Sequence, residues 1–242
     1  MKSLIRFILG KNYKYLNSKY WKLVSFIYPI FIAKKGTLVY AGINVGDSFQ
    51  KIFYKYNKVL GFEPNIKNYD KIKHYNKIEG VKIFNFALST KEGIEDFYLP
   101  DNFNNDASAS LSDFSDSSGI KSTNVIKVKT INLCDVLINN SISEIDFYIS
   151  DTEGYDFTIL KTIYDKYIKT KKIQKIQVEA VNNLVKNPFI KITNYESDFD
   201  KLLLSNYNKT GVGSGIIKKG DNFKSEDLKG KTLDLLYQLK QK

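Results

Sequence analysis

The sequence predicts an α/β fold in which a mostly parallel sheet is covered by helices on both faces. With 242 residues, 43% of them hydrophobic, the chain can bury one large core. Short apolar runs alternate with helical patterns, and buried parallel strands have this appearance because both of their faces pack against helices. We expect strands at 37–41, 58–62, 81–87, 145–150 and 173–179, and helices at about 46–56, 65–77, 132–138 and 156–167.

Residues 38–63 carry the most specific of these elements. Gly42 allows a sharp turn after the first apolar run, and Gly46 allows the next helix to approach closely. Backbone N–H groups at the start of that helix then face a ligand. The second run ends in Glu63, 17 residues beyond Gly46, where a carboxylate can accept both hydroxyls of a ribose. These features predict half of a nucleotide-binding βαβ unit.

The chain between the third and fourth strands predicts an insertion at about 92–130. Alternating segments at 94–99 and 125–130 favour antiparallel strands, and the long polar segment between them is a candidate lid. Near the end of the chain, 207–218 contains three glycines and predicts a hairpin that finishes the sheet. The pattern at 225–240 predicts a closing helix.

Residues 1–36 are basic and aromatic and predict a helical extension up to Pro29, ahead of one domain over 37–242. Three roles remain open for this extension. It could pack on the sheet edge, form a contact in a homo-oligomer, or make a weak peripheral membrane contact through residues 1–33.

Composition narrows the class of protein. The net charge is +11, but Arg6 is the only arginine among 37 basic residues, and we therefore expect no nucleic-acid partner. The longest apolar run, at 23–33, is too short to span a membrane. A single cysteine, Cys134, excludes a disulfide framework and fits a reducing compartment, so we expect a cytoplasmic protein.

Polar side chains follow the expected strands at their carboxyl ends, where ligands bind in doubly wound sheets. Asp151, Glu153 and Tyr155 follow the fourth strand, and the fifth ends at Glu179, before Asn182. Each carboxylate has a structural interpretation, as a helix cap, an ion-pair partner or an acceptor of backbone N–H groups. Gathering three of them at adjacent strand ends is nevertheless costly unless they share a ligand, a metal or a proton. Together they favour a site.

Several of these segments resemble the FkbM family in their order and spacing over about residues 38–180. They are Val39–Gly46, Gly61–Asn65, Phe84–Ser89, Ser108–Leu111, Ile145–Gly154 and Gln177–Glu179. The resemblance implies a Rossmann-like class I methyltransferase fold, with a mostly parallel seven-stranded sheet and a C-terminal antiparallel hairpin. It also implies an O-methyltransferase that uses S-adenosylmethionine as its cofactor.

The resemblance further assigns roles to residues. The implied cofactor-binding residues are Tyr40, Gly42, Asn44, Gly46, Glu63, Pro64, Asn65, Ala87, Leu88 and Asp151. Apart from the resemblance, Asp151 lies where the transferred methyl should emerge and is expected to act as the base or as a ligand, and Glu153 and Glu179 are expected to orient substrate hydroxyls. The expected substrate contacts are Ser108, Ser110, Tyr155 and Asn182.

Two positions depart from the pattern of the family. Tyr40 stands where the family usually has Asp, and Ile149 stands where it usually has Lys. These departures support an alternative function, a non-catalytic cofactor- or anion-binding protein that keeps the fold.

The resemblance implies methylation of a carbohydrate hydroxyl, on a nucleotide-activated sugar or a capsular or surface polysaccharide. A divalent metal held by Asp151, Glu179 and Asn182 is a less favoured addition. An NAD-dependent oxidoreductase is disfavoured because Gly-x-Gly-x-x-Gly is absent. A methyltransferase acting on nucleic-acid bases is disfavoured because no Asn/Asp-Pro-Pro-aromatic segment follows the fourth strand.

Overall fold

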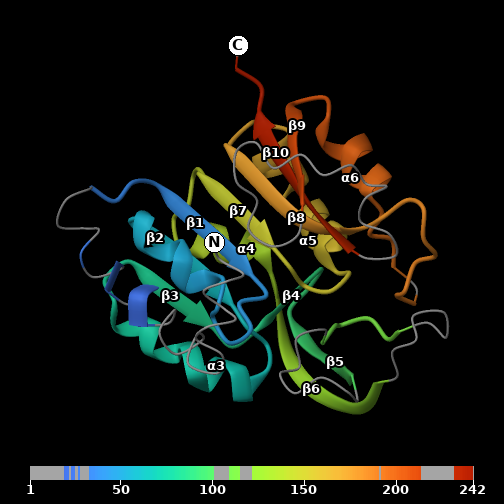
Figure 1. The fold of residues 1–242 in the computed structure, drawn as a ribbon, viewed down its shortest axis with the longest axis horizontal. Coiled ribbons are helices and arrows are strands. Elements are labelled where there is room, and N and C mark those ends of the chain that lie inside the picture. The colour runs from blue at the N-terminus through green and yellow to red at the C-terminus, as the bar shows by residue number, and fades with distance from the viewer. Residues whose placement is uncertain are drawn as a thin grey trace, which may run out of the picture.

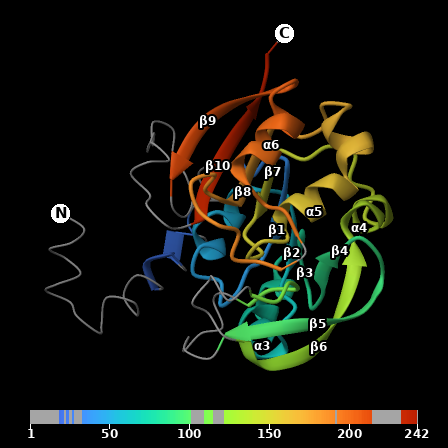
Figure 2. The same ribbon diagram turned by 90° about the vertical axis from the view of Figure 1, so that its right-hand side faces the viewer.

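A computed structural model describes most of the chain, and its main body is a central sheet with helices on both faces (Figure 1). The described residues are 19–21, 23, 24, 27, 33–100, 109–114, 122–190, 192–213 and 232–241. A smaller sheet lies beside one end of the central sheet, as both views show (Figures 1 and 2).

Within the described residues, the central sheet holds seven strands in the order β3-β2-β1-β7-β8-β10-β9. Their bounds are Val81–Phe84 (β3), Lys58–Phe62 (β2), Thr37–Ala41 (β1), Phe147–Ser150 (β7), Lys175–Val181 (β8), Thr232–Leu239 (β10) and Tyr207–Gly213 (β9). The first five in this order pair in parallel, and β10 pairs antiparallel with both of its neighbours. The predicted class I methyltransferase fold with a C-terminal antiparallel hairpin is confirmed.

The apolar runs form strands because both faces of the sheet are covered. All five residues of β1 are buried, and they alternate between two core clusters on opposite faces. One face packs against α4 (Leu133–Asn139), α5 (Asp156–Thr162) with the π-helical turn η5 (Tyr164–Ile168), and α6 (Glu196–Leu203). The other packs against the 3₁₀ turns η1 (Phe49–Lys51) and η2 (Phe53–Lys55), and against α3 (Ile66–Ile72) with η3 (Lys73–Lys77).

The smaller sheet has the order β4-β6-β5. It is built from Ala87–Ser89 (β4), Gly93–Pro100 (β5) and Ser122–Asn132 (β6), with β5 and β6 antiparallel as the alternating pattern predicts. Phe97 and Leu99 of β5 and Val128 of β6 share a small core with Ala87. The expected strand at 81–87 therefore divides, since β3 ends at Phe84 and β4 belongs to the second sheet.

The predicted closing helix at 225–240 is wrong over its described part, because Thr232–Leu239 is strand β10. The second strand of the hairpin is thus β10, and not a part of 207–218. A leucine-rich segment favours a helix locally. Here it lies between β8 and β9, where Leu233, Leu235 and Tyr237 alternate into the core, and tertiary burial outweighs the local preference.

The expected helix at 46–56 is replaced by η1 and η2. Phe49, Gln50, Ile52, Phe53 and Tyr54 are all buried, and a helix that packs through one face cannot bury so many near-consecutive residues. Two tight 3₁₀ turns direct these side chains towards the core instead.

The described residues of the N-terminal extension are helical at 19–21, 23, 24 and 27. Trp21 stacks on Tyr54 of η2 at a ring-centroid distance of 6.5 Å, whereas Tyr20 and Leu23 are exposed. Within the described part of the chain, no helix combines the length and the apolar character needed to cross a bilayer.

Candidate active site

A pocket with about 640 Å³ of empty space, its open mouth included, lies at the carboxyl ends of β1, β2 and β7. The lining residues are Ala41, Gly42, Asn44, Phe62, Glu63, Pro64, Asn68, Phe86, Ala87, Leu88, Phe97, Ala109, Leu111, Asp151, Thr152, Glu153 and Tyr155.

The turn after β1 forms the floor of this pocket. The N–H groups of Gly42 and Ile43 both donate to the carbonyl of Phe62, so the turn folds onto the end of β2. Gly42 has φ +78°, and a Cβ atom there would lie 1.8 Å from the carbonyl oxygen of Asp151. Glycine is therefore required for β1 and β7 to meet at this point.

Glu63 is held by the backbone on both of its carboxylate oxygens. Oε2 accepts the N–H of Asn44 at 2.7 Å, and Oε1 accepts the N–H of Asn65 at 2.9 Å. Asn44 has φ +55°, a left-handed conformation that asparagine tolerates better than most residues. Because a carboxylate oxygen has two lone pairs, each oxygen can accept a second hydrogen bond from a ligand.

The pocket fits an adenosyl ligand in its polar and apolar parts. Asn44 lines the pocket, and its buried Oδ1 atom has no hydrogen-bond partner among the described residues, so a ligand donor would satisfy it. Ala87 and Leu88 supply apolar surface to the same pocket that Glu63 and Pro64 line. The roles of Glu63 at a ribose and of Ala87 and Leu88 at an adenine stay predictions.

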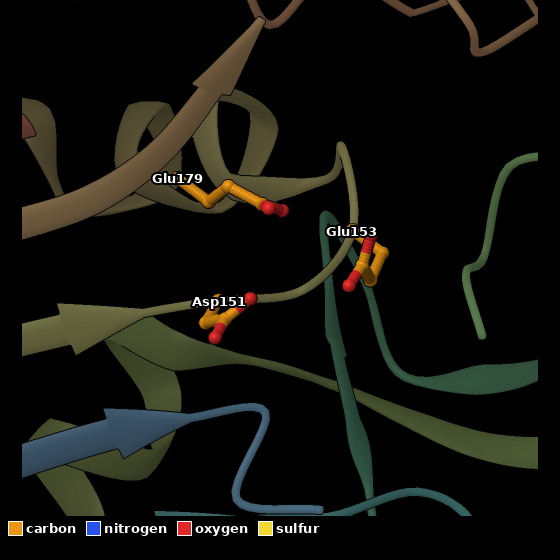
Figure 3. Close-up of side chains that lie close together, drawn as sticks. All are labelled: Asp151, Glu153 and Glu179. Carbon is orange, nitrogen blue, oxygen red and sulfur yellow. The ribbon is translucent and has the colours of Figure 1, made fainter. Parts of the chain in front are cut away.

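Three carboxylates gather beside this pocket. Asp151 follows β7, Glu153 lies in the next loop, and Glu179 projects from β8. Each offers an oxygen that lies within 4.8 Å of the others, and the side chains point towards one another (Figure 3). The sheet thus brings together the three acids that the sequence predicts as catalytic residues.

Proximity and burial raise the pKa of these groups. Desolvation is the main cause that raises the pKa of Asp151 to about 7, and the charges of Asp234 and Asp156 add to it. Desolvation also raises the pKa of Glu153 and of Glu179 well above the usual range for a carboxylic acid, with a further contribution from the neighbouring acids. A pKa near neutrality suits a general base, because the group is often ionised and still binds a proton well.

The loop that carries Asp151 and Glu153 is tightly constrained. Glu153 has φ +53°, and Gly154 has φ +97° with its Cα hydrogens against Phe189. A non-glycine residue in this region carries strain of roughly 1–3 kcal/mol, which the surroundings must balance. The buried Asp156 helps, because its carboxylate accepts the N–H of Thr152 at 3.2 Å and a hydrogen bond from Ser150.

Ser110 connects the insertion to this loop. Its buried hydroxyl donates to the carbonyl of Glu153 at 2.6 Å and accepts the N–H of Ser112 at 3.0 Å. Ser112 in turn donates to the carbonyl of Ile190 at 2.6 Å. Segment 109–114 is thereby held next to the pocket, which Ala109 and Leu111 line.

Other predicted site residues lie away from the pocket lining. Tyr40 packs edge-on against Phe49 in the core, and Gly46 lies against Ile72 with φ +87°. Asn65 caps α3 through its side chain, and Asn182 accepts the N–H of Leu184 at 3.0 Å. Tyr155, by contrast, is one of the residues that line the pocket, and Ser108 falls outside the described residues.

Two acidic residues of this region were missed by sequence reasoning. Asp234 of β10 pairs in register with Glu179 of β8. The expectation of a helix at 225–240 gave no reason to place Asp234 beside Glu179. Asp156 opens α5, and its place one residue beyond the Asp151–Tyr155 loop was the available signal.

The strand order, the pocket at the carboxyl ends and the position of Glu63 define the class of S-adenosylmethionine-dependent methyltransferases. The sequence profile of the methyltransferase FkbM domain matches residues 41–204. The chain belongs to the FkbM methyltransferase family, and its cofactor is S-adenosylmethionine.

Solved structures of other methyltransferases resemble the chain at low sequence identity. Magnesium protoporphyrin IX methyltransferase from Synechocystis is 8% identical to this chain, with a TM-score of 0.41. The aligned region covers 93% of this chain and 83% of that enzyme. A TehB-like S-adenosylmethionine-dependent methyltransferase from Corynebacterium glutamicum is 8% identical with a TM-score of 0.40, covering 94% and 98%. No curated protein is significantly similar in sequence. The family assignment rests on the domain match.

Proposed function

We propose that the protein is an O-methyltransferase that acts on a hydroxyl group of a carbohydrate, on a nucleotide-activated sugar or a surface polysaccharide. The observation that carries this proposal is the placement of Asp151, which lines the pocket and lies among the other carboxylates. The cytoplasm is the expected location, in line with the single free cysteine, Cys134.

The cofactor side of the site is formed by this chain's own polar groups. Glu63 would accept hydrogen bonds from the ribose hydroxyls, and Asn44 Oδ1 would accept one from another donor of the cofactor. S-adenosylmethionine supplies an electrophilic methyl group when it is bound. Gly42 keeps the β1 turn free of a side chain, so that a ligand can approach the backbone.

The acceptor side needs a group that takes the proton of a hydroxyl and groups that orient the acceptor. Asp151 is the proposed base, since its pKa of about 7 lets it hold a proton after transfer. Glu153 and Glu179 would accept hydrogen bonds from neighbouring hydroxyls of a polyol. Tyr155 and segment 109–114 would cover the acceptor and exclude water.

The test has two stages. Calorimetric titration with S-adenosylhomocysteine, with NAD as the control ligand, should show micromolar binding of the former alone. Mass spectrometry of nucleotide sugars incubated with S-adenosylmethionine and the protein should then show a gain of one methyl group. Cofactor binding without methylation of any hydroxyl acceptor would favour the alternative, a binding protein that has kept the fold.

A further inference from the structure

The three carboxylates beside the pocket have the spacing of a metal site. Their nearest oxygens lie within 4.8 Å of one another. Divalent cations that prefer oxygen bind their ligands at about 2.0–2.6 Å, so two ligands on opposite sides of one ion lie about 4–5 Å apart. Oxygens within 4.8 Å of one another lie close enough that small side-chain rotations of Asp151, Glu153 and Glu179 would let one ion contact all three.

A second observation concerns Glu179 alone. Glu179 is only 9% exposed. The side chain of Thr232 bonds to its carboxyl, but the buried Oε2 atom has no hydrogen-bond partner among the residues that the structure describes. That carboxyl points into the cluster (Figure 3). A buried carboxylate oxygen without a partner costs free energy, and a cation at the centre of the cluster would remove this cost.

No cationic side chain takes this role in the described part of the chain. The ion pairs between described residues join lysines to Asp70, Asp96, Asp165, Glu196 and Asp200. The acids of the cluster are absent from these pairs, despite the excess of lysine in the sequence.

We propose that Asp151, Glu153 and Glu179 bind one divalent cation of the Mg²⁺ or Mn²⁺ type. This ligand set differs from the one expected from the sequence, because Asn182 Oδ1 already accepts the N–H of Leu184, and Glu153 takes its place. Three carboxylates leave coordination positions for water or for acceptor oxygens. The inference rests on the proposed function in this respect alone, that the ion would orient the hydroxyl to be methylated; with the ion bound, the ion and not Asp151 as a free carboxylate would assist loss of the hydroxyl proton.

The experiment is a calorimetric titration of the EDTA-treated, full-length protein with MnCl₂, followed by competition with MgCl₂. One saturable site is expected. Glu179→Gln and Asp151→Asn, which keep the shape of the side chain but remove its charge, should each weaken Mn²⁺ binding at least tenfold. Asp165→Asn, in an acid whose side chain is 89% exposed in η5, should leave the affinity unchanged.

Absence of saturable Mn²⁺ binding to the wild-type protein would overturn the proposal, and so would equal affinity in all three variants. Circular dichroism separates loss of ligands from loss of fold, and Asp151→Asn provides a second ligand variant if Glu179→Gln does not fold. The proposed function is tested separately, by measuring S-adenosylhomocysteine binding and methyl transfer. If cofactor binding and turnover persist in EDTA and Mn²⁺ does not bind, the metal proposal is wrong and the methyltransferase proposal stands.

Discussion

Glu63 and Glu179 are both nearly buried carboxylates at strand ends, but their surroundings differ. Both oxygens of Glu63 accept backbone N–H groups, from Asn44 and Asn65. Glu179 faces two other acids, and its Oε2 has no partner within the described part of the chain. The proposed cofactor side of the site is thus satisfied by the fold itself, whereas the proposed acceptor side needs a proton, a cation or a ligand to complete it.

The two carboxylates therefore differ in how the folded protein prepares them to bind a ligand. Backbone donors hold the carboxylate of Glu63 in place before any ligand binds. The acidic cluster places like charges together, which destabilises the protein but tunes the acids for proton transfer or cation binding. The following predictions test that contrast, from the largest expected effect to the smallest.

Asp151→Asn should abolish most of the turnover while leaving cofactor affinity nearly unchanged. Loss of a general base typically lowers the rate by about 10²–10⁴-fold. Methyl-transfer rates and S-adenosylhomocysteine titration on the same preparation provide the measurement, with Asp165→Asn as the control. A retained rate would place the base elsewhere in the cluster.

Gly42→Ala should destabilise the protein by roughly 3 kcal/mol, because the new Cβ meets the Asp151 carbonyl and the backbone has φ +78°. Urea unfolding measures the change. Gly93→Ala is the matched control, since its Cβ would lie 3.7 Å from Thr130 Oγ1, an ordinary contact distance. Equal stability of the two variants would contradict the close approach of β1 and β7.

Glu63→Ala should weaken cofactor binding by about 1–3 kcal/mol, the cost of leaving hydrogen-bonding groups unpaired. Glu63→Gln keeps an acceptor oxygen and should lose less. Titration with S-adenosylhomocysteine measures both variants, and a Kd unchanged from wild type in Glu63→Ala would refute the ribose assignment.

The pH dependence of stability should report the acidic cluster in metal-free protein. Burial, together with Asp234 and Asp156, raises the pKa of Asp151 from 3.8 to about 7. The folded state therefore binds this proton more tightly than the unfolded state, so the contribution to stability is complete below about pH 4 and is lost as the pH rises through about 7. Asp151→Asn should flatten the fall in Tm over this range, and a slope identical to that of the wild type would contradict the assignment.

Several parts of the site were predictable because they depend on neighbouring residues in the chain. The turn at Gly42, the acid at Glu63 and the loop from Asp151 to Tyr155 are short segments with special backbone requirements. Asp234 could not be found in this way. Its role depends on pairing between β10 and β8, and the Leu-rich sequence around it has a local preference for helix.

Sequence by itself determined the family, the parallel strands around β1 and the acids that follow them, because apolar runs and glycine turns act locally. Tertiary structure alone decided that β10 is a strand, that Ser110 is a buried anchor of the Glu153 loop, and that Asp151, Glu153 and Glu179 face one another. The physical reason is that burial and strand register join residues distant in the chain, and these long-range contacts outweigh the local preferences that a sequence displays.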